Sequence, residues 1–217
     1  MRRILGFAGP LVAMLVMASP ALAERVHVRI EGARSTIWGA QEPLVTPVTG
    51  TITPPSGETL TVNDPTPFGA LERASRRGEF FYATKTFSFG SYVSQIGRYA
   101  EGTTTGWAYK VNGVSPPVGS TDYTLKDGDR VLWYFARFGP SGGPKTLLLR
   151  RRQGCFKAFA QDDAGKTAAV GDVAFRVNGR RVASRSGRIC PVRRVRSIRV
   201  SKPGFVRSAV LTGAAAR

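Results

Sequence analysis

Histidine is nearly absent from this chain of 217 residues, which contains a single one, His27. An active site of the Ser-His-Asp or Cys-His type needs a histidine beside its nucleophile, and no supporting motif accompanies His27. This residue lies between Arg25 and Arg29 on the polar face of a strand-like segment, which favours an imidazole at the surface. Glycine motifs for phosphate or dinucleotide binding are also missing. The sequence therefore predicts that the protein is not an enzyme and has no catalytic residue.

The inventory of metal ligands is equally small. Zinc sites are built from clustered histidines and cysteines, and the sequence has no such cluster. Asp122, Asp127 and Asp129 lie close together, but they lack calcium-loop spacing, and turn formation accounts for them. Cys155 and Cys190 bracket one small segment and predict a disulfide, worth roughly 4 kcal/mol in the chain-entropy model. Two buried free thiols are the alternative, and no metal site is expected.

Long apolar runs are confined to the N-terminus. A basic "MRR" precedes the run "ILGFAGPLVAMLVMA", and "ALA" ends at Ala23. This order is typical of a secretory signal peptide, residues 1–23. A membrane anchor is the weaker interpretation, because the run is shorter than the roughly 20 residues that span a bilayer and contains Pro10. We expect an exported protein in the extracellular space or the cell envelope.

Acidic residues are rare in the last third of the chain. Residues 24–138 hold 12 Lys or Arg against 11 Asp or Glu, whereas residues 139–217 hold 18 against 3. The change falls at "FGPSGGPK", whose glycines and prolines are typical of a linker. We therefore expect a first domain at 24–138, a linker at 139–144 and a basic second domain at 145–217.

Such a charge excess suits contact with acidic wall polymers, anionic lipids or other polyanions. The alternative is an arginine-rich composition with solvated side chains. Specific nucleic-acid binding is not expected, because no base-reading motif accompanies the charge. The expected anion contacts are Arg150, Arg151, Arg152, Arg180, Arg181, Arg193 and Arg194.

The sequence of the first domain predicts short strands around one helix. "RVHVRIEG" alternates as a half-buried strand, and "GWAYKVNG" places Trp107, Tyr109 and Val111 on one face. Thr66 and Pro67 begin a helix of about ten residues that should end before Gly78. The expected class is α+β for this domain, followed by an all-β domain. In the second domain, alternating strands and turns such as Asn178-Gly179 predict a small β-sandwich.

Several sequence segments between residues 57 and 135 resemble a known protein family. "FGSYVSQIGRYA", "GWAYKVNGV" and "VGSTDYTLKDGDRVLWYF" occur in that order. The region resembles the transcobalamin C-terminal-like, DUF4430-type domain of secreted bacterial proteins, which implies a β-grasp fold, soluble-ligand binding and no catalysis. Cobalamin is the ligand that this resemblance suggests. "DDAGKTAAVGDVAFRVNGRRVAS" and "IRVSKPGFVRSAVL" more weakly resemble carboxypeptidase regulatory-like or transthyretin-like sandwiches, which are adhesive or structural modules.

The aromatic side chains of the first domain have two interpretations. Trp107 and Trp133 suit a packed core, whereas tyrosines suit a rim where their hydroxyls meet water. The expected ligand-binding residues are Phe89, Tyr92, Tyr99, Trp107, Tyr109 and Tyr134. We therefore expect an exported, non-catalytic ligand-binding protein whose basic domain contacts anionic envelope polymers. The alternative is a structural or adhesive surface protein without a small-molecule ligand.

Overall fold

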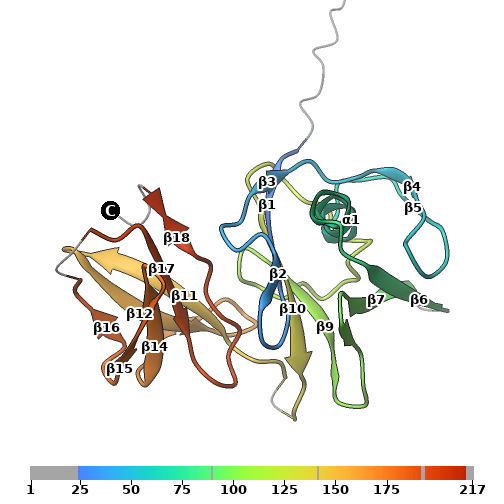
Figure 1. The fold of residues 1–217 in the computed structure, drawn as a ribbon. Helices are drawn as coiled ribbons and strands as arrows, with labels where there is room; N and C mark the ends of the chain where they lie inside the picture. Colours follow the sequence, from blue (N-terminus) through green and yellow to red (C-terminus); the bar gives the residue numbers. More distant parts are fainter. Residues whose placement is uncertain (1–23, 89, 141, 192–193, 214–217) are drawn as a thin grey trace, which may run out of the picture.

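A computed structural model describes residues 24–88, 90–140, 142–191 and 194–213. The chain forms two bodies that pack side by side, one from β1 to β10 and one from β11 to β18 (Figure 1). The expected signal peptide lies outside the described residues. No helix in the described part is long and apolar enough to cross a bilayer.

A five-stranded sheet forms the centre of the molecule. It contains β1 (Val26–Glu31), β2 (Thr36–Trp38), β3 (Leu44–Val45), β9 (Thr105–Val111) and β10 (Arg130–Arg137). The strand order is β2-β1-β10-β9, and β3 also pairs with β1. Strands β1 and β10 run parallel, whereas the other pairs are antiparallel. Because β9 is last in the strand order, it is an edge strand of this sheet.

Both faces of the central sheet are covered. Val28, Ile30 and Trp133 pack on one face with the core of the first domain. Leu132 and Tyr134 point to the opposite face, where the second domain packs against them. Period-two alternation had predicted a half-buried first strand, and this was wrong, because the second domain removes its polar face from water.

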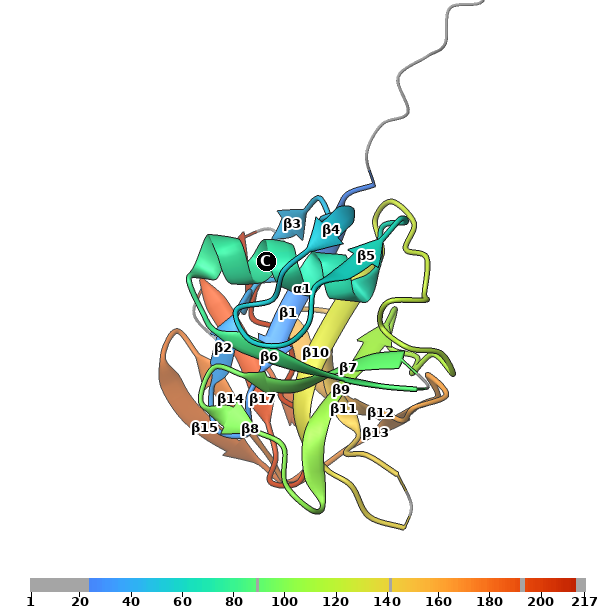
Figure 2. The same ribbon diagram turned by 90° about the vertical axis from the view of Figure 1, so that its right-hand side faces the viewer.

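The first face of the sheet lies under α1 (Pro67–Gly78), as Figure 2 shows. Thr66 caps the helix by accepting a hydrogen bond from the Gly69 main chain at 3.1 Å, and Pro67 occupies the first turn, as predicted. The helix ends slightly later than predicted, because Glu79, in a left-handed conformation with φ of 50°, makes the C-terminal cap.

Two further small sheets surround the helix. One pairs β4 (Gly50–Ile52) with β5 (Leu60–Val62). The other joins β6 (Tyr82–Phe87), β7 (Gly90–Ile96) and β8 (Tyr99–Ala100).

The predicted α+β class with a β-grasp first domain was wrong. The described residues form eighteen strands and one helix of 12 residues, so the chain is mostly β throughout. In the first domain the strands divide among three sheets. Prolines and glycines explain this division, because they cut the segments after β1 into strands too short to extend a single sheet.

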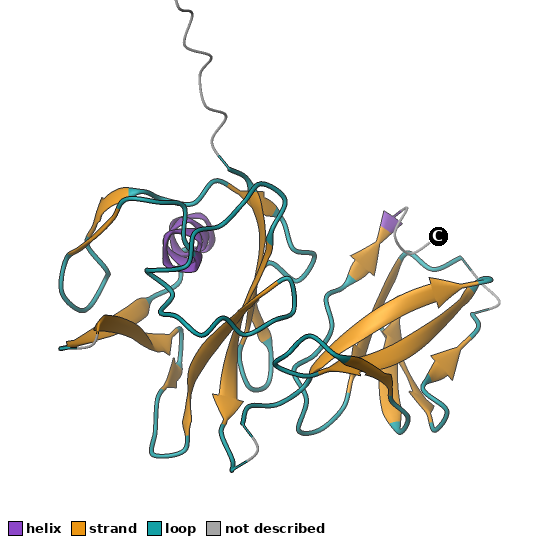
Figure 3. Cartoon of the chain, turned by 180° about the vertical axis from the view of Figure 1, so that it is seen from behind, coloured by secondary structure: helices purple, strands orange, loops and turns teal. Residues whose placement is uncertain are grey.

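The second domain is a β-sandwich, as predicted (Figure 3). One sheet contains β11 (Thr146–Arg152), β12 (Cys155–Gln161), β13 (Thr167–Ala169) and β16 (Arg188–Ile189). The other contains β14 (Val173–Val177), β15 (Arg180–Ser184), β17 (Ser197–Ser201) and β18 (Leu211–Thr212). Leu147, Phe156, Phe175, Ile198 and Val200 form the core between them.

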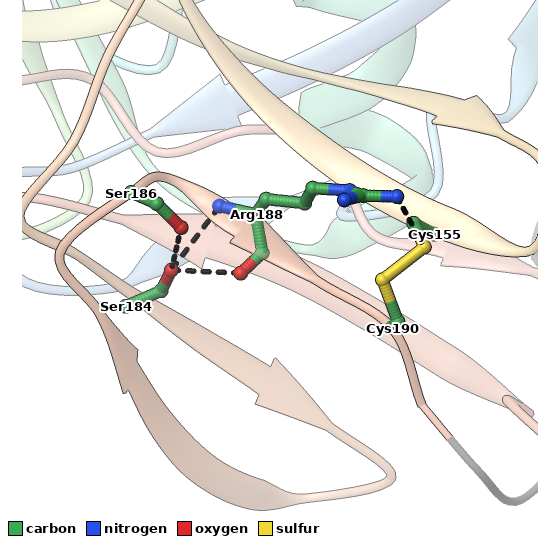
Figure 4. The surroundings of a disulfide bond; sticks show 5 residues. All are labelled: Cys155, Ser184, Ser186, Arg188 and Cys190. Carbon is green, nitrogen blue, oxygen red and sulfur yellow. Dashed lines mark hydrogen bonds between the residues drawn. A yellow bond between two sulfur atoms is a disulfide. The ribbon is translucent and has the colours of Figure 1, made fainter.

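The predicted disulfide joins Cys155 at the start of β12 to Cys190 after β16 (Figure 4). Arg188 donates a hydrogen bond to the sulfur of Cys155 at 3.1 Å. Ser184 in turn bonds both the main-chain NH and the carbonyl of Arg188. The bridge therefore fastens the short edge strand β16 to the sheet, and β15 is connected to it through Ser184.

A buried carboxylate joins the two domains. Glu31 on β1 is 1% exposed and receives Arg29 from its own strand, Arg199 from β17 and Arg207 from the following segment. The Arg207 guanidinium lies 2.7 Å from the carboxylate and also donates to the Gly32 carbonyl. Burial lowers the pKa of Arg199, while the charge of Glu31 opposes that effect. We call this group the Glu31 clamp.

A lysine makes a second connection between the domains. Lys110 on β9 is fully buried, and its ammonium lies 3.0 Å from the Asp163 carboxylate and 3.2 Å from the Asp162 carbonyl. The same ammonium lies 5.7 Å from the centre of the Tyr134 ring. Between this contact and the Glu31 clamp, Leu132, Tyr134 and Val206 form an apolar cluster across the boundary.

We predict that Glu31→Gln lowers the free energy of unfolding by about 3–5 kcal/mol, because it leaves buried guanidinium charges without their carboxylate. Glu101→Gln is the matched control, since Glu101 pairs with the exposed Lys85, and it should cost less than ~1 kcal/mol. Urea denaturation of both variants measures the difference. Equal losses would show that the clamp is energetically no different from a surface pair.

We also predict that removing the disulfide weakens the second domain selectively. In the chain-entropy model a sequence separation of 35 residues corresponds to roughly 4 kcal/mol. Replacing Cys155 and Cys190 together by serine should expose amides of β12 and β16 to hydrogen exchange while those of β1 and β10 stay protected. Uniform loss of protection along the whole chain would contradict a local role for the bridge.

Candidate functional site

A hollow of about 420 Å³ lies along the edge strand β9. Its walls come from β7, from the segment 115–120 and from the turn around Gly142 and Gly143. Five aromatic side chains of the central sheet and β7 line it, namely Tyr92, Trp107, Tyr109, Trp133 and Tyr134. We call this hollow the aromatic groove. It brings together four of the six side chains that the sequence predicted as ligand contacts.

The strand at the base of the groove has unpaired main-chain groups. The Asn112 NH donates to the Arg130 carbonyl and the Phe138 NH donates to the Thr104 carbonyl, which fixes the hydrogen-bonding parity of β9 with β10. The main-chain NH and carbonyl groups of Trp107 and Tyr109 therefore point away from β10. Within the described residues, the main-chain NH and carbonyl groups of Trp107 and Tyr109 make no main-chain hydrogen bond. The groove thus combines apolar rings with free polar groups of an edge strand.

The polar ends of the aromatic side chains are bonded within the protein. Tyr109 donates its hydroxyl to the Val118 carbonyl at 2.7 Å, and Trp107 donates its indole NH to the Tyr99 carbonyl at 2.8 Å. Tyr92 donates to Glu101. Their rings therefore have fixed orientations and leave apolar surface, rather than hydroxyls, for a ligand.

Burial also keeps these phenols neutral. It raises the pKa of Tyr109 to about 12, assisted by the negative charge of Asp122. It raises the pKa of Tyr92 to about 12, assisted by the hydrogen bond to Glu101. An ordinary tyrosine is already uncharged at neutral pH, and the raised pKa values extend the neutral range of both side chains to higher pH, which suits contact with an uncharged, flat ligand.

Tyr99 lies outside the groove. Its ring packs against Phe135 at 5.4 Å and beneath the guanidinium of Arg98 at 5.1 Å. Burial would raise its pKa, but hydrogen bonds with Arg98, Ser35 and the main chain of Arg34 outweigh burial and lower the pKa to about 8. Phe89, the remaining predicted contact, lies outside the described residues.

The rim position predicted for Tyr134 was wrong. Tyr134 is 2% exposed and lies on the face of β10 that meets the second domain. Tyr134 follows Trp133 on β10, so alternation places the two side chains on opposite faces of the sheet, and the second domain covers the face with Tyr134. Burial raises the Tyr134 pKa to about 12, with a further contribution from the charge of Asp163.

One wall residue comes from the second domain. Asp163 lines the groove, and its main-chain carbonyl accepts a hydrogen bond from the Ser115 NH at 2.8 Å. The Lys110 ammonium holds the Asp163 carboxylate from the other side. Asp163 was not among the predicted site residues, because no local motif indicates that the turn after β12 reaches β9.

The predicted anion contacts do not form one patch. Arg150, Arg151 and Arg152 are exposed at the end of the edge strand β11, where Arg150 also lies over the Phe159 ring at 4.6 Å. Arg180 and Arg194 line a hollow of about 610 Å³ together with Arg196.

Arg181 belongs to a different surface, because adjacent residues of β15 point to opposite faces, and it lines another cavity. Arg193 lies outside the described residues.

His27 is more constrained than a surface histidine. Its Nδ1 lies 2.7 Å from the Glu42 carbonyl, and Glu42 also binds Arg29 and Arg130. Burial lowers the His27 pKa, and the positive charge of Arg130 lowers it further. The imidazole is therefore held neutral beside β1 at neutral pH.

A comparison with protein families agrees with the central part of the resemblance. The sequence model of a family described as "Domain of unknown function (DUF4430)" matches residues 77–137. The matched segment runs from the end of α1 through β10 and contains most of the aromatic groove. No curated protein matches the chain. The DUF4430 assignment is thus confirmed for this segment, whereas the transcobalamin-like and transthyretin-like resemblances stay predictions.

Proposed function

We propose that this protein is a non-catalytic binding protein that holds a small soluble ligand in the aromatic groove. The observation that carries the proposal is that Tyr92 on β7 meets Trp107 and Tyr109 on β9 in one hollow. Rings whose polar ends are already bonded supply rigid apolar surface at low entropic cost. A ligand with a flat apolar face and an edge that can bond free main-chain groups fits this arrangement best.

The size of the groove narrows the ligand class. A hollow of about 420 Å³ falls within the roughly 300–1,000 Å³ that drug-sized ligands occupy. Cobalamin, which the family resemblance suggests, would have one face of its corrin ring covered and the other left in solvent. A smaller planar molecule would bury a larger fraction of its surface here.

We further propose that the protein is exported and that its second domain contacts anionic polymers or lipids of the cell envelope. The charge distribution supports this, because residues 139–217 carry 18 basic against 3 acidic side chains. Many of these basic side chains are exposed, which leaves them available for such contacts.

We predict that cyanocobalamin or the neutral planar dye N-phenylnaphthylamine quenches tryptophan fluorescence saturably, because Trp107 and Trp133 line the groove. Tyr92→Ala should weaken binding ~10-fold, since it removes one aromatic contact, whereas Tyr92→Phe keeps the ring and should bind normally. Ser91→Trp should abolish binding by filling the groove.

Phe81→Ala serves as the matched control for this experiment, because Phe81 is an exposed aromatic residue outside the groove. It should bind as tightly as the unmodified chain. Absence of saturable binding by both probes would overturn the ligand-binding proposal and favour the structural or adhesive alternative. Equal weakening by Phe81→Ala and Tyr92→Ala would place the binding elsewhere.

A further inference from the structure

Two adjoining cavities follow the boundary between the domains. They measure about 780 Å³ and about 620 Å³, and both are lined by Ala33, Gly204, Phe205 and Arg207. One therefore continues into the other along the turn after β1 and the turn after β17. We call the two together the boundary groove.

Basic side chains line the whole length of the boundary groove. The first cavity has Arg137, Lys145 and Arg207 in its wall. The second has Arg34, Arg181, Arg185 and Lys202, in addition to the shared Arg207. Seven basic residues thus face a groove to which both domains contribute.

Little negative charge opposes them. The acidic residues in the two walls are Glu31 and Asp172. Glu31 is buried and its carboxylate is already held by three arginines in the clamp. Seven basic against two acidic residues leave an excess of five positive charges in the wall.

Four of the basic side chains are available to a ligand. Arg34, Lys145, Arg181 and Arg185 are exposed, and within the described residues their side chains have no hydrogen-bond or ion-pair partner. The other three are anchored: Arg207 binds Glu31, the Lys202 ammonium donates to the Gly171 carbonyl at 2.7 Å, and Arg137 donates to the Thr104 hydroxyl at 3.2 Å. The groove therefore has a fixed base and a rim of free cations.

We propose that the boundary groove binds a linear anionic glycan, a polymer of sugars that carries carboxylates or phosphates at intervals. The proposal rests on the proposed envelope contact and assigns it to this groove instead of the arginines at the end of β11. An elongated cavity with cations from both domains suits a chain that lies along it and forms several charge-assisted hydrogen bonds. Guanidinium groups match carboxylate and phosphate oxygens in particular.

The aromatic rings of the boundary groove favour a glycan over single-stranded nucleic acid. Nucleic-acid grooves of this kind add rings on which bases stack. Here Phe135 packs against Tyr99 and Trp107, and the Lys202 ammonium lies 5.7 Å from the Phe205 ring. Phe138, at 41% exposed, is the ring left for stacking among the described wall residues. Charge, rather than stacking, therefore dominates this surface.

Two variants of the full chain with equal charge loss test the proposal. The groove variant replaces the four free rim cations, Arg34, Lys145, Arg181 and Arg185, by glutamine. The control variant replaces Arg150, Arg151, Arg152 and Arg194 by glutamine. All eight side chains are exposed, so both variants should fold, which circular dichroism verifies. Binding to polygalacturonate, to a phosphorylated mannan and to oligothymidylate is measured over a range of salt concentrations.

We expect the groove variant to bind at least one anionic glycan ~10-fold more weakly, with a flatter salt dependence, and the control variant to change by less than ~3-fold. The carboxylate and phosphate polymers distinguish the two sources of negative charge. A greater loss in the control variant would refute the groove while leaving the envelope contact intact. No glycan binding by the unmodified chain would refute both. Tighter, groove-dependent binding of oligothymidylate would refute the glycan as partner.

Discussion

The buried carboxylate of Glu31 is the constraint on which the arrangement of the two domains depends. A carboxylate that is 1% exposed needs compensating charge, and two of its three guanidinium partners, Arg199 and Arg207, come from the second domain. Their geometry determines which face of the central sheet is covered and where the turn after β1 meets the turn after β17. The boundary groove lies beside this clamp, and Lys110 fixes the far end of the same interface at the aromatic groove.

The two grooves meet at the turn that contains Phe138, Gly142 and Gly143, but their chemistry differs. The aromatic groove follows an edge strand and presents neutral rings whose polar ends are bonded internally. The boundary groove presents free cations, and it exists only while the domains are in contact. Asp163 and Ser115 show that even the aromatic groove is completed by the second domain. Because the turn with Phe138, Gly142 and Gly143 lines both grooves, a small ligand in one and a polymer in the other would come close together there.

Local patterns in the sequence predicted the features that local chemistry determines. The Thr66 cap, the disulfide, the sandwich and the DUF4430 segment all follow from neighbouring residues or from one cysteine pair. The β-grasp prediction failed because hydrogen bonds between distant segments decide how short strands divide into sheets. The burial of Tyr134 and the separation of Arg180 from Arg181 were missed for a related reason. Composition identifies a basic region, but strand parity and domain contact decide which surface each side chain joins.

The Glu31 clamp has a consequence for the order in which the molecule can assemble. Glu31 lies 168 residues from Arg199 and 176 residues from Arg207 along the chain, so β1 meets these partners only after both arginines have been made. Contacts this distant in sequence close large loops and form late in folding. Until then the polar face of β1 stays hydrated, and a chain interrupted before residue 199 would have a central sheet with one bare side. The clamp can therefore form only after the chain has been made through Arg207.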